Sequence, residues 1–139
     1  MSRQHRRLLH GESGQAIVEF ALASLVFFMT IFGILEFGVA IWQYNMVSNL
    51  AQEGARWASV RGSTTSIPSG PVSAADVQTF VQGRSVGITV TVTTTPVPST
   101  LMPGQIVSVL VRTDFAPLTS LIPLTAMTLQ SRASMVMAR

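Results

Sequence analysis

The strongest pattern in the chain is an apolar run near its N-terminus. Residues 20–35 carry no charge, and with its flanks the apolar region covers about 27 positions, interrupted by Glu19 and Glu36. At about 1.5 Å per residue, such a helix is roughly 40 Å long and exceeds a hydrocarbon core of roughly 30 Å. A buried core helix is the alternative, but the rest of the chain is too short and too polar to surround one. The pattern therefore predicts a transmembrane helix over residues 15–42.

The flanks of this run differ in charge. Arg3, Arg6 and Arg7 precede it, whereas the first basic residues after it are Arg56 and Arg61. Because basic residues are retained on the cytoplasmic side, this asymmetry predicts a single pass through the cytoplasmic (inner) membrane with the N-terminus inside.

A cleaved secretory signal is a competing interpretation of the same run. Such signals have an apolar core of roughly 7 to 15 residues followed by small residues at the cleavage site. Here the run is longer, and it ends at Trp42 and Tyr44, whose rings favour the headgroup layer. The pattern favours a membrane anchor that stays in place.

Beyond the membrane, residues 43–62 change to an amphipathic pattern that continues the helix outside. The apolar stripe recurs at spacings of three and four and consists of Met46, Val47, Leu50, Ala51, Gly54, Trp57 and Ala58. This stripe either packs on the chain's own sheet or forms a partner surface. On the polar side, which includes Ser59, we expect a weak pair between Glu53 and Arg56, and Gly62 is a suitable helix stop.

The remaining residues, 63–139, predict a small α/β domain. Residues 63–72 read as a loop, and Ser73 with Asp76 forms a capping-box start for a short helix that ends near residues 84–87. Period-two alternation predicts strands over 88–93 and 106–113 and a last strand from Met127 towards the C-terminus. The predicted fold class is α+β: one long N-terminal helix, a short second helix and a small antiparallel three-stranded sheet.

The amino-acid composition argues against most enzymatic and ligand-binding functions. The chain is 47% apolar and 11% charged and has no cysteine, which excludes disulfides and thiol chemistry. Both histidines lie in residues 1–14, and beyond Gly62 the only acids are Asp76 and Asp114. Because no base can activate a Ser or Thr and no ligand set is present, we expect no catalytic residue, metal, cofactor or small-molecule substrate. The scattered arginines give no basic stripe for nucleic acid.

The junction between the basic leader and the apolar run resembles a known family. Gly14, followed by four residues and then Glu19-Phe20, is similar to the processing site of Flp-type type IV pilins. The extended pattern resembles the TadE-like pseudopilins of the tight-adherence system. The likeness continues through Glu36-Phe37-Gly38 and through residues 49–58, which contain an A-x-x-G-A-R block.

The resemblance implies that a prepilin peptidase cuts after Gly14, so that Gln15 becomes the first mature residue. The chain would then divide into a cytoplasmic leader (1–14), a transmembrane helix (15–42), its extracytoplasmic continuation (43–62) and a pilin-like outer domain (63–139). A glycine at the cut permits close approach to an active site. The alternative is that Gly14 merely starts the helix.

Glu19 is the residue with the most physical information, because a carboxylate in an apolar helix is costly. In pilins the matching Glu, here followed by Phe20, is thought to meet the N-terminal amine of a neighbouring subunit, a group with a pKa of roughly 7.7–8.0. The alternative is that Glu19 lies in the headgroup layer and stabilises the helix N-terminus. Cyclisation of Gln15 would remove the amine charge.

Glu36 follows Glu19 by 17 residues, about 25 Å further along the helix and on a different face. It is expected near the outer interface, where it is either solvated or makes a subunit or assembly contact.

The resulting expectation is a minor pseudopilin used in the assembly or initiation of a Flp/tight-adherence pilus for surface attachment. Its expected partners are the prepilin peptidase, other pilins and pseudopilins, the assembly platform and inner-membrane lipid, and after processing it would join an extracellular filament. The alternative is a signal-anchored binding or sensory protein that uses Phe115, Leu118, Leu121 and Ile122.

Overall fold

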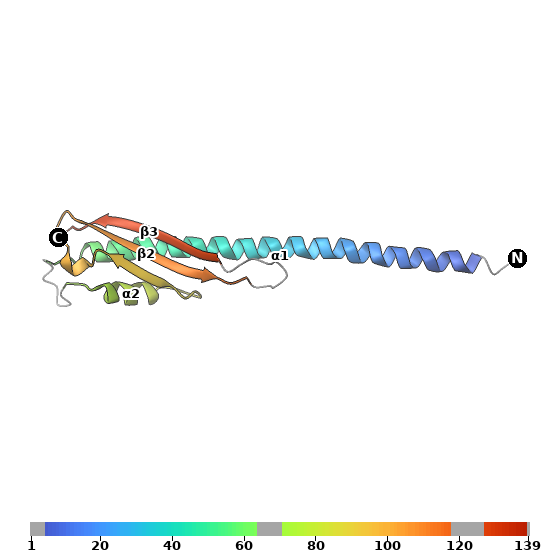
Figure 1. Cartoon of the computed structure of the whole chain (residues 1–139), viewed down its shortest axis with the longest axis horizontal. Coiled ribbons are helices and arrows are strands. Elements are labelled where there is room, and N and C mark those ends of the chain that lie inside the picture. Colours follow the sequence, from blue (N-terminus) through green and yellow to red (C-terminus); the bar gives the residue numbers. More distant parts are fainter. Residues whose placement is uncertain (1–4, 64–70, 118–126, 139) are drawn as a thin grey trace.

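The protein consists of one long helix and a small sheet domain built around the far end of that helix (Figure 1). The computed structural model describes residues 5–63, 71–117 and 127–138, with the side chains of the first helix described from Gly14 onward. The elements in chain order are α1 (His5–Ser59), α2 (Ala74–Gln82), β1 (Thr91–Thr95), the 3-10 helix η1 (Pro98–Thr100), β2 (Ile106–Phe115) and β3 (Met127–Val136). The predicted α+β fold class is confirmed.

The three strands form an antiparallel sheet in the order β1-β2-β3. The β2 and β3 strands pair without a break from Ile106↔Val136 to Phe115↔Met127, as the alternation in both segments predicts. The first strand was expected over residues 88–93, but its pairing runs from Thr91↔Arg112 to Thr95↔Ser108. The alternation was assigned correctly, and only the hydrogen-bonded segment lies further along the chain.

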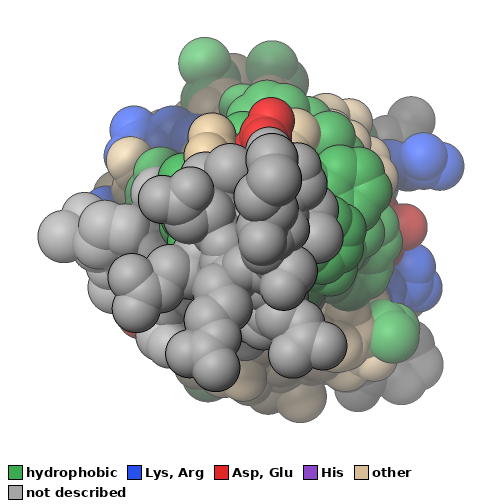
Figure 2. Space-filling model, turned by 90° about the vertical axis from the view of Figure 1, so that its right-hand side faces the viewer, with side chains coloured by type: hydrophobic (Ala, Val, Ile, Leu, Met, Phe, Trp, Pro, Cys, Tyr) green, Lys and Arg blue, Asp and Glu red, His purple; other side chains and the backbone are tan. Residues whose placement is uncertain are grey.

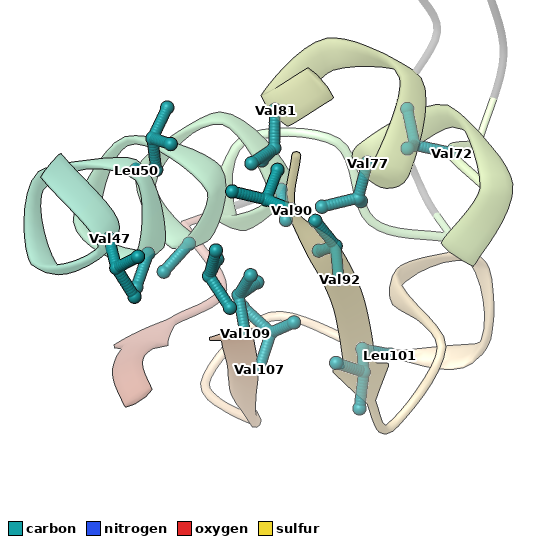
Figure 3. Close-up of a cluster of buried hydrophobic side chains, with 14 of the residues drawn as sticks. Val47, Leu50, Val72, Val77, Val81, Val90, Val92, Leu101, Val107 and Val109 are labelled. Carbon is teal, nitrogen blue, oxygen red and sulfur yellow. The ribbon is translucent and has the colours of Figure 1, made fainter. Parts of the chain in front are cut away.

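One face of the sheet is covered by helices, and the core lies between them (Figure 3). In Figure 3, side chains from α1, α2, β1 and β2 point towards one another, and most of them are valines. The fully buried members from these elements include Val47, Val77, Val81, Val107, Val109 and Val111. Since valine is stiff and β-branched, it suits strands that pack against helices at short distance.

The apolar stripe of residues 46–58 packs on the chain's own sheet, which decides between the two interpretations of that stripe. Leu50, Ala51 and Ala58 are buried, and Met46 and Trp57 pack at the border of the core. The pattern predicts Ser59 on the polar side, which is wrong: Ser59 is buried, and its hydroxyl donates a hydrogen bond to the carbonyl of Arg56 at 2.9 Å.

The C-terminal end of α1 is held by a backbone hydrogen bond from the segment after β3, and the residues after α1 are held to the segment after η1. The helix ends at Ser59 instead of near Gly62, and the carbonyl of Ser59 accepts a hydrogen bond from the amide of Ala138 at 2.9 Å. The amide of Ser63 donates to the carbonyl of Leu101 at 3.0 Å. The end of α1 is therefore an integral part of the domain, while its N-terminal half extends away from it (Figure 1).

Candidate processing and assembly segment

The junction at Gly14 and Gln15 lies inside α1, which begins at His5. The interpretation that Gly14 only starts the helix is therefore wrong. Both residues are exposed, and a Cβ added at Gly14 would meet no atom within 4 Å. Packing within the described chain gives no reason for a glycine here.

The segment of α1 after this junction presents its apolar side chains outward. Ile17 is 69% exposed and Phe20 is 74% exposed, and the pattern continues to Ile31 with little interruption. Figure 2, which views the molecule from the N-terminal side of α1, shows hydrophobic side chains beside the residues drawn in grey, with an acidic side chain next to them. An apolar surface of this extent needs lipid or neighbouring helices to cover it.

Glu19 and Phe20 lie in this uncovered segment. Both are exposed, and among the residues the structure describes no side chain pairs with the Glu19 carboxylate. Because Glu19 and Phe20 are consecutive, their side chains leave the helix in directions about 100° apart. The structure thus leaves both residues available for contacts outside the chain, and their role in assembly stays a prediction.

Glu36 lies where the outer domain begins to cover one face of α1. Its side chain is only 3% exposed, so the solvated interpretation of this carboxylate is wrong. The nearby Phe32 and Gly33 are partly covered as well, whereas residues 25–31 are exposed. A subunit or assembly contact by Glu36 remains untested, and burial within the chain limits how far another subunit could reach it.

The A-x-x-G-A-R block packs inside the domain, as one interpretation of the apolar stripe expects for Ala51 and Gly54. Ala51, Gly54 and Ala55 are buried in the contact of α1 with the sheet and α2. A Cβ at Gly54 would lie 2.8 Å from Cγ2 of Val81 and 3.2 Å from Cγ1 of Val109. Small residues here let the helix approach both elements closely.

A layered stack of side chains joins α2 to α1 beside this block. The rings of Trp57 and Phe80 are stacked with centroids 4.7 Å apart. The guanidinium of Arg61 lies 4.4 Å from the Trp57 ring, and that of Arg84 lies 4.5 Å from the Phe80 ring. Arg84 also pairs with Glu53 at 3.0 Å. Glu53 therefore pairs across to the end of α2 instead of with Arg56, as was expected.

The apolar contact in this stack is expected to stabilise the domain more than its ion pair does. Phe80→Ala is expected to lower the free energy of unfolding by about 2 kcal/mol, because it removes apolar burial and the stacking on Trp57. Glu53→Gln is expected to cost less than about 1 kcal/mol, because its ion pair with Arg84 is solvent-exposed. Denaturant unfolding of the full chain in detergent micelles measures both values. Equal losses would contradict this ranking.

The start of α2 confirms the predicted capping box. The hydroxyl of Ser73 accepts a hydrogen bond from the amide of Asp76, whose carboxylate accepts one from the Ser73 amide at 2.9 Å. The Ser73 hydroxyl also donates to the same carboxylate at 2.7 Å. These bonds from the Ser73 side chain and backbone lower the pKa of Asp76 below its ordinary value of 3.8.

A pH dependence follows from this lowered pKa. The contribution of Asp76 to stability is complete above its ordinary pKa of 3.8 and is lost as the pH falls through the lower folded pKa. We expect α2 to fray at its N-terminus over that acidic range, and Asp76→Asn to abolish the dependence. Cα chemical shifts of residues 74–77 as a function of pH measure this. An unchanged acid response in Asp76→Asn would contradict it.

The comparison with protein families identifies the N-terminal part of the chain. Residues 14–56 match the family model of the TadE-like proteins. This region is TadE-like. The match begins at the junction glycine and ends with the arginine of the A-x-x-G-A-R block, so it confirms the resemblance stated from the sequence. Searches of curated proteins and of solved structures gave no significant match.

The match over residues 14–56 is consistent with a TadE-like protein of the tight-adherence pilus system. The helix Gly14–Ser59 includes an apolar stretch long enough to cross a membrane, which is consistent with membrane anchoring. Within the described residues, no three His, Asp or Glu side chains gather where they could hold a metal ion.

Proposed function

We propose that the protein is a minor pseudopilin of the Flp/tight-adherence system, processed after Gly14 and used in assembly or initiation of the pilus for surface attachment. The observation that carries the proposal is the stretch of α1 over residues 14–31, an exposed apolar helix segment in which Glu19 is the one carboxylate, just beyond the Gly14 junction. Such a helix suits lipid before assembly and neighbouring helices afterwards.

The proposed processing step needs the helix to unwind at Gly14. A peptidase cuts backbone that enters its active site in an accessible conformation, and glycine in a helix interior costs about 1 kcal/mol relative to alanine. Gly14 therefore lowers the cost of local unwinding. Because its Cβ position is open, the same glycine is not needed for packing in the described chain.

The proposed role of Glu19 is to set the register of an incoming subunit. After cleavage the amine of Gln15 lies four residues from its own Glu19, and the carboxylate would pair with the amine of a neighbouring copy or pilin. In a low-dielectric layer a misplaced subunit leaves both charges unpaired, which costs several kcal/mol. The exposure of Glu19 and its lack of a partner among the described side chains support this role.

Glu19→Ala is expected to leave processing intact and to lower incorporation into filaments at least about tenfold, which corresponds to about 1.4 kcal/mol. The measurement is the ratio of filament-associated to membrane-associated protein in cells that make the pilus. Mass spectrometry of the mature N-terminus shows whether Gln15 keeps its amine. Glu53→Ala, which removes a carboxylate from the outer part of α1, serves as the control. Normal incorporation of Glu19→Ala would contradict amine pairing.

The competing function, a signal-anchored binding or sensory protein, has less support. Its proposed contact residue Phe115 is 2% exposed and belongs to the packed end of β2. The other three residues of that proposal, Leu118, Leu121 and Ile122, lie outside the described residues. The two functions differ in whether the chain is cut at Gly14.

A further inference from the structure

A hollow of about 380 Å³ opens on the surface where α2 lies beside the C-terminal turns of α1. Figure 1 shows these two helices next to each other. The apolar part of the wall comes from the stacked rings of Trp57 and Phe80 and from Val60, which is 49% exposed. The charged part of the wall consists of Arg56, Arg61, Arg84 and Glu53. The hollow therefore has an excess of positive charge beside an apolar surface.

The residues that α1 contributes to this wall belong to one side of the helix. Glu53, Arg56 and Trp57 are three or four residues apart, which makes them neighbours on the helix surface. This is the side of α1 that faces α2, because Trp57 stacks on Phe80 and Glu53 pairs with Arg84. A ligand in the hollow can therefore contact both helices at once.

Two of the arginines are held in place by the aromatic rings. The Arg61 guanidinium lies 4.4 Å from the centroid of the Trp57 ring, and its Nη1 donates to the carbonyl of Trp57 at 3.0 Å. The Arg84 guanidinium lies 4.5 Å from the centroid of the Phe80 ring. A guanidinium that is already fixed loses little freedom when it binds a carboxylate, and its remaining N–H groups stay available.

The positive charge of the hollow is only partly balanced within the chain. Glu53 pairs with Arg84 at 3.0 Å, and among the described residues Arg56 and Arg61 form no ion pair. The other acidic residues of the chain are engaged or distant: Glu12 and Glu19 lie in the N-terminal part of α1, Glu36 is buried, Asp76 binds Ser73 and Asp114 binds Thr128. A second copy of this chain therefore has no suitable carboxylate to offer, and the charge favours a different, acidic partner.

Two other sources of negative charge fit the hollow less well. Val60 follows Trp42 by 18 residues, which is about 27 Å along the helix axis, so in the proposed membrane placement lipid headgroups lie out of reach. An inorganic anion would satisfy the arginines and leave the apolar wall uncovered. A protein segment can supply both carboxylates and an apolar side chain.

We propose that this hollow docks an acidic segment of another protein, in which carboxylates flank an apolar or aromatic side chain. Arg56 and Arg61 bind the carboxylates through charge-assisted hydrogen bonds. The apolar side chain packs against Val60 and the edges of the Trp57 and Phe80 rings, and Trp and Arg are the residue types that carry much of the energy at protein interfaces. This inference goes beyond the proposed function and uses its membrane placement only to exclude lipid.

The test uses a fluorescent peptide of about nine residues in which glutamates surround one phenylalanine. Its binding to the full chain in nonionic micelles is measured by fluorescence anisotropy. Matched peptides replace the glutamates by glutamines or the phenylalanine by alanine. We expect the first replacement to weaken binding at least about tenfold and the second about threefold, because both the charge-assisted bonds and the apolar contact contribute.

Variants of the chain locate the binding. Arg56→Gln and Arg61→Gln should each weaken binding about fivefold. Arg61→Lys should fall between Arg61→Gln and the unaltered chain, because lysine keeps the charge without the planar stacking. Glu53→Gln should tighten binding about threefold, since it releases Arg84 from its ion pair, and misfolding does not produce such a gain. Arg132→Gln, on β3 and outside this wall, should leave binding unchanged.

The double variant Arg56→Gln/Arg61→Gln measures the background from other basic residues, including the three arginines of residues 1–14. Equal binding by this variant and by the unaltered chain would overturn the proposal. A photoreactive group in place of the peptide's phenylalanine should label residues 53–61 or 80–84, and labelling confined to other segments would also contradict it. So would displacement of the peptide by a sulfated polysaccharide or by anionic vesicles of equal charge concentration, which would show a general polyanion site. Processing is measured separately in cells, so failure of either proposal leaves the other standing.

Discussion

Gly14→Leu is expected to reduce the mature form in cells from nearly all of the protein to less than about a tenth, because a bulky side chain at the cut blocks entry of the backbone into the peptidase. The longer precursor should accumulate in the membrane, and no subunit should reach the filament. Intact-mass measurement of the membrane fraction distinguishes precursor from mature chain, since the two differ by residues 1–14.

The structure separates this effect from misfolding. Since a Cβ at Gly14 meets nothing within 4 Å, the substitution should leave the outer domain unchanged. Gly38 provides a matched control on the same helix, because its Cβ position is also open. Gly38→Leu should be processed normally. If Gly14→Leu were processed and exported like the unaltered chain, the pseudopilin function would be wrong and the signal-anchored alternative would gain.

Gly54→Leu is expected to destabilise the outer domain by about 3 kcal/mol, because overpacking of a tight contact costs about 1–3 kcal/mol or more. The new Cβ alone would approach Val81 and Val109 to 2.8 and 3.2 Å, and the rest of the leucine has no room between α1, α2 and β2. Val81 and Val109 are fully buried and stiff, so backbone has to move. The measurement is the unfolding midpoint and the protease resistance of the full chain in micelles.

A smaller change at the same site tests the cause. Gly54→Ala gains up to about 1 kcal/mol of helix propensity, which offsets part of the clash, so its net loss should be much smaller. Combined with Val81→Ala, which removes the Cγ2 atom nearest the new Cβ, Gly54→Ala should cost less than it does in the unaltered background. Gly38→Ala should be neutral or stabilising. If Gly54→Leu were no worse than Gly54→Ala, close packing would not explain this glycine.

The sequence pattern predicted the elements better than it predicted their partners. Hydrophobic periodicity identified the long helix, the short one and β2 and β3, because burial on one face imposes a period that survives in the sequence. Periodicity placed the start of β1 too early, because the alternation of apolar and polar residues follows burial and not the hydrogen bonds between strands. Ile88 and Val90 alternate inward like Val92, but the carbonyl of Thr89 accepts the hydroxyl of Thr113 and strand pairing starts only at Thr91.

The candidate site divides in the same way. Gly14 and Glu19 stand out in the sequence because Gly14 ends the basic leader and Glu19 interrupts the apolar run, and their roles stay predictions. The partner of Glu53 could not be identified, since Arg84 lies 31 residues away and meets it only once α2 has docked on α1. The burial of Glu36 and the tight contact at Gly54 also depend on how the outer domain folds back along the helix. Contacts between distant segments leave no periodic signal.

Because α1 is one continuous helix, it connects its exposed apolar segment rigidly to the sheet. The helix contains no proline and runs from the apolar segment into the core without interruption. Each residue of helix between Glu19 and Val47 therefore adds about 100° of rotation about the helix axis and about 1.5 Å of distance between Glu19 and the sheet. The number of residues in this stretch sets the direction, around the helix axis, in which a subunit presents its outer surface relative to Glu19. A single insertion would reorient that surface without altering any contact within it.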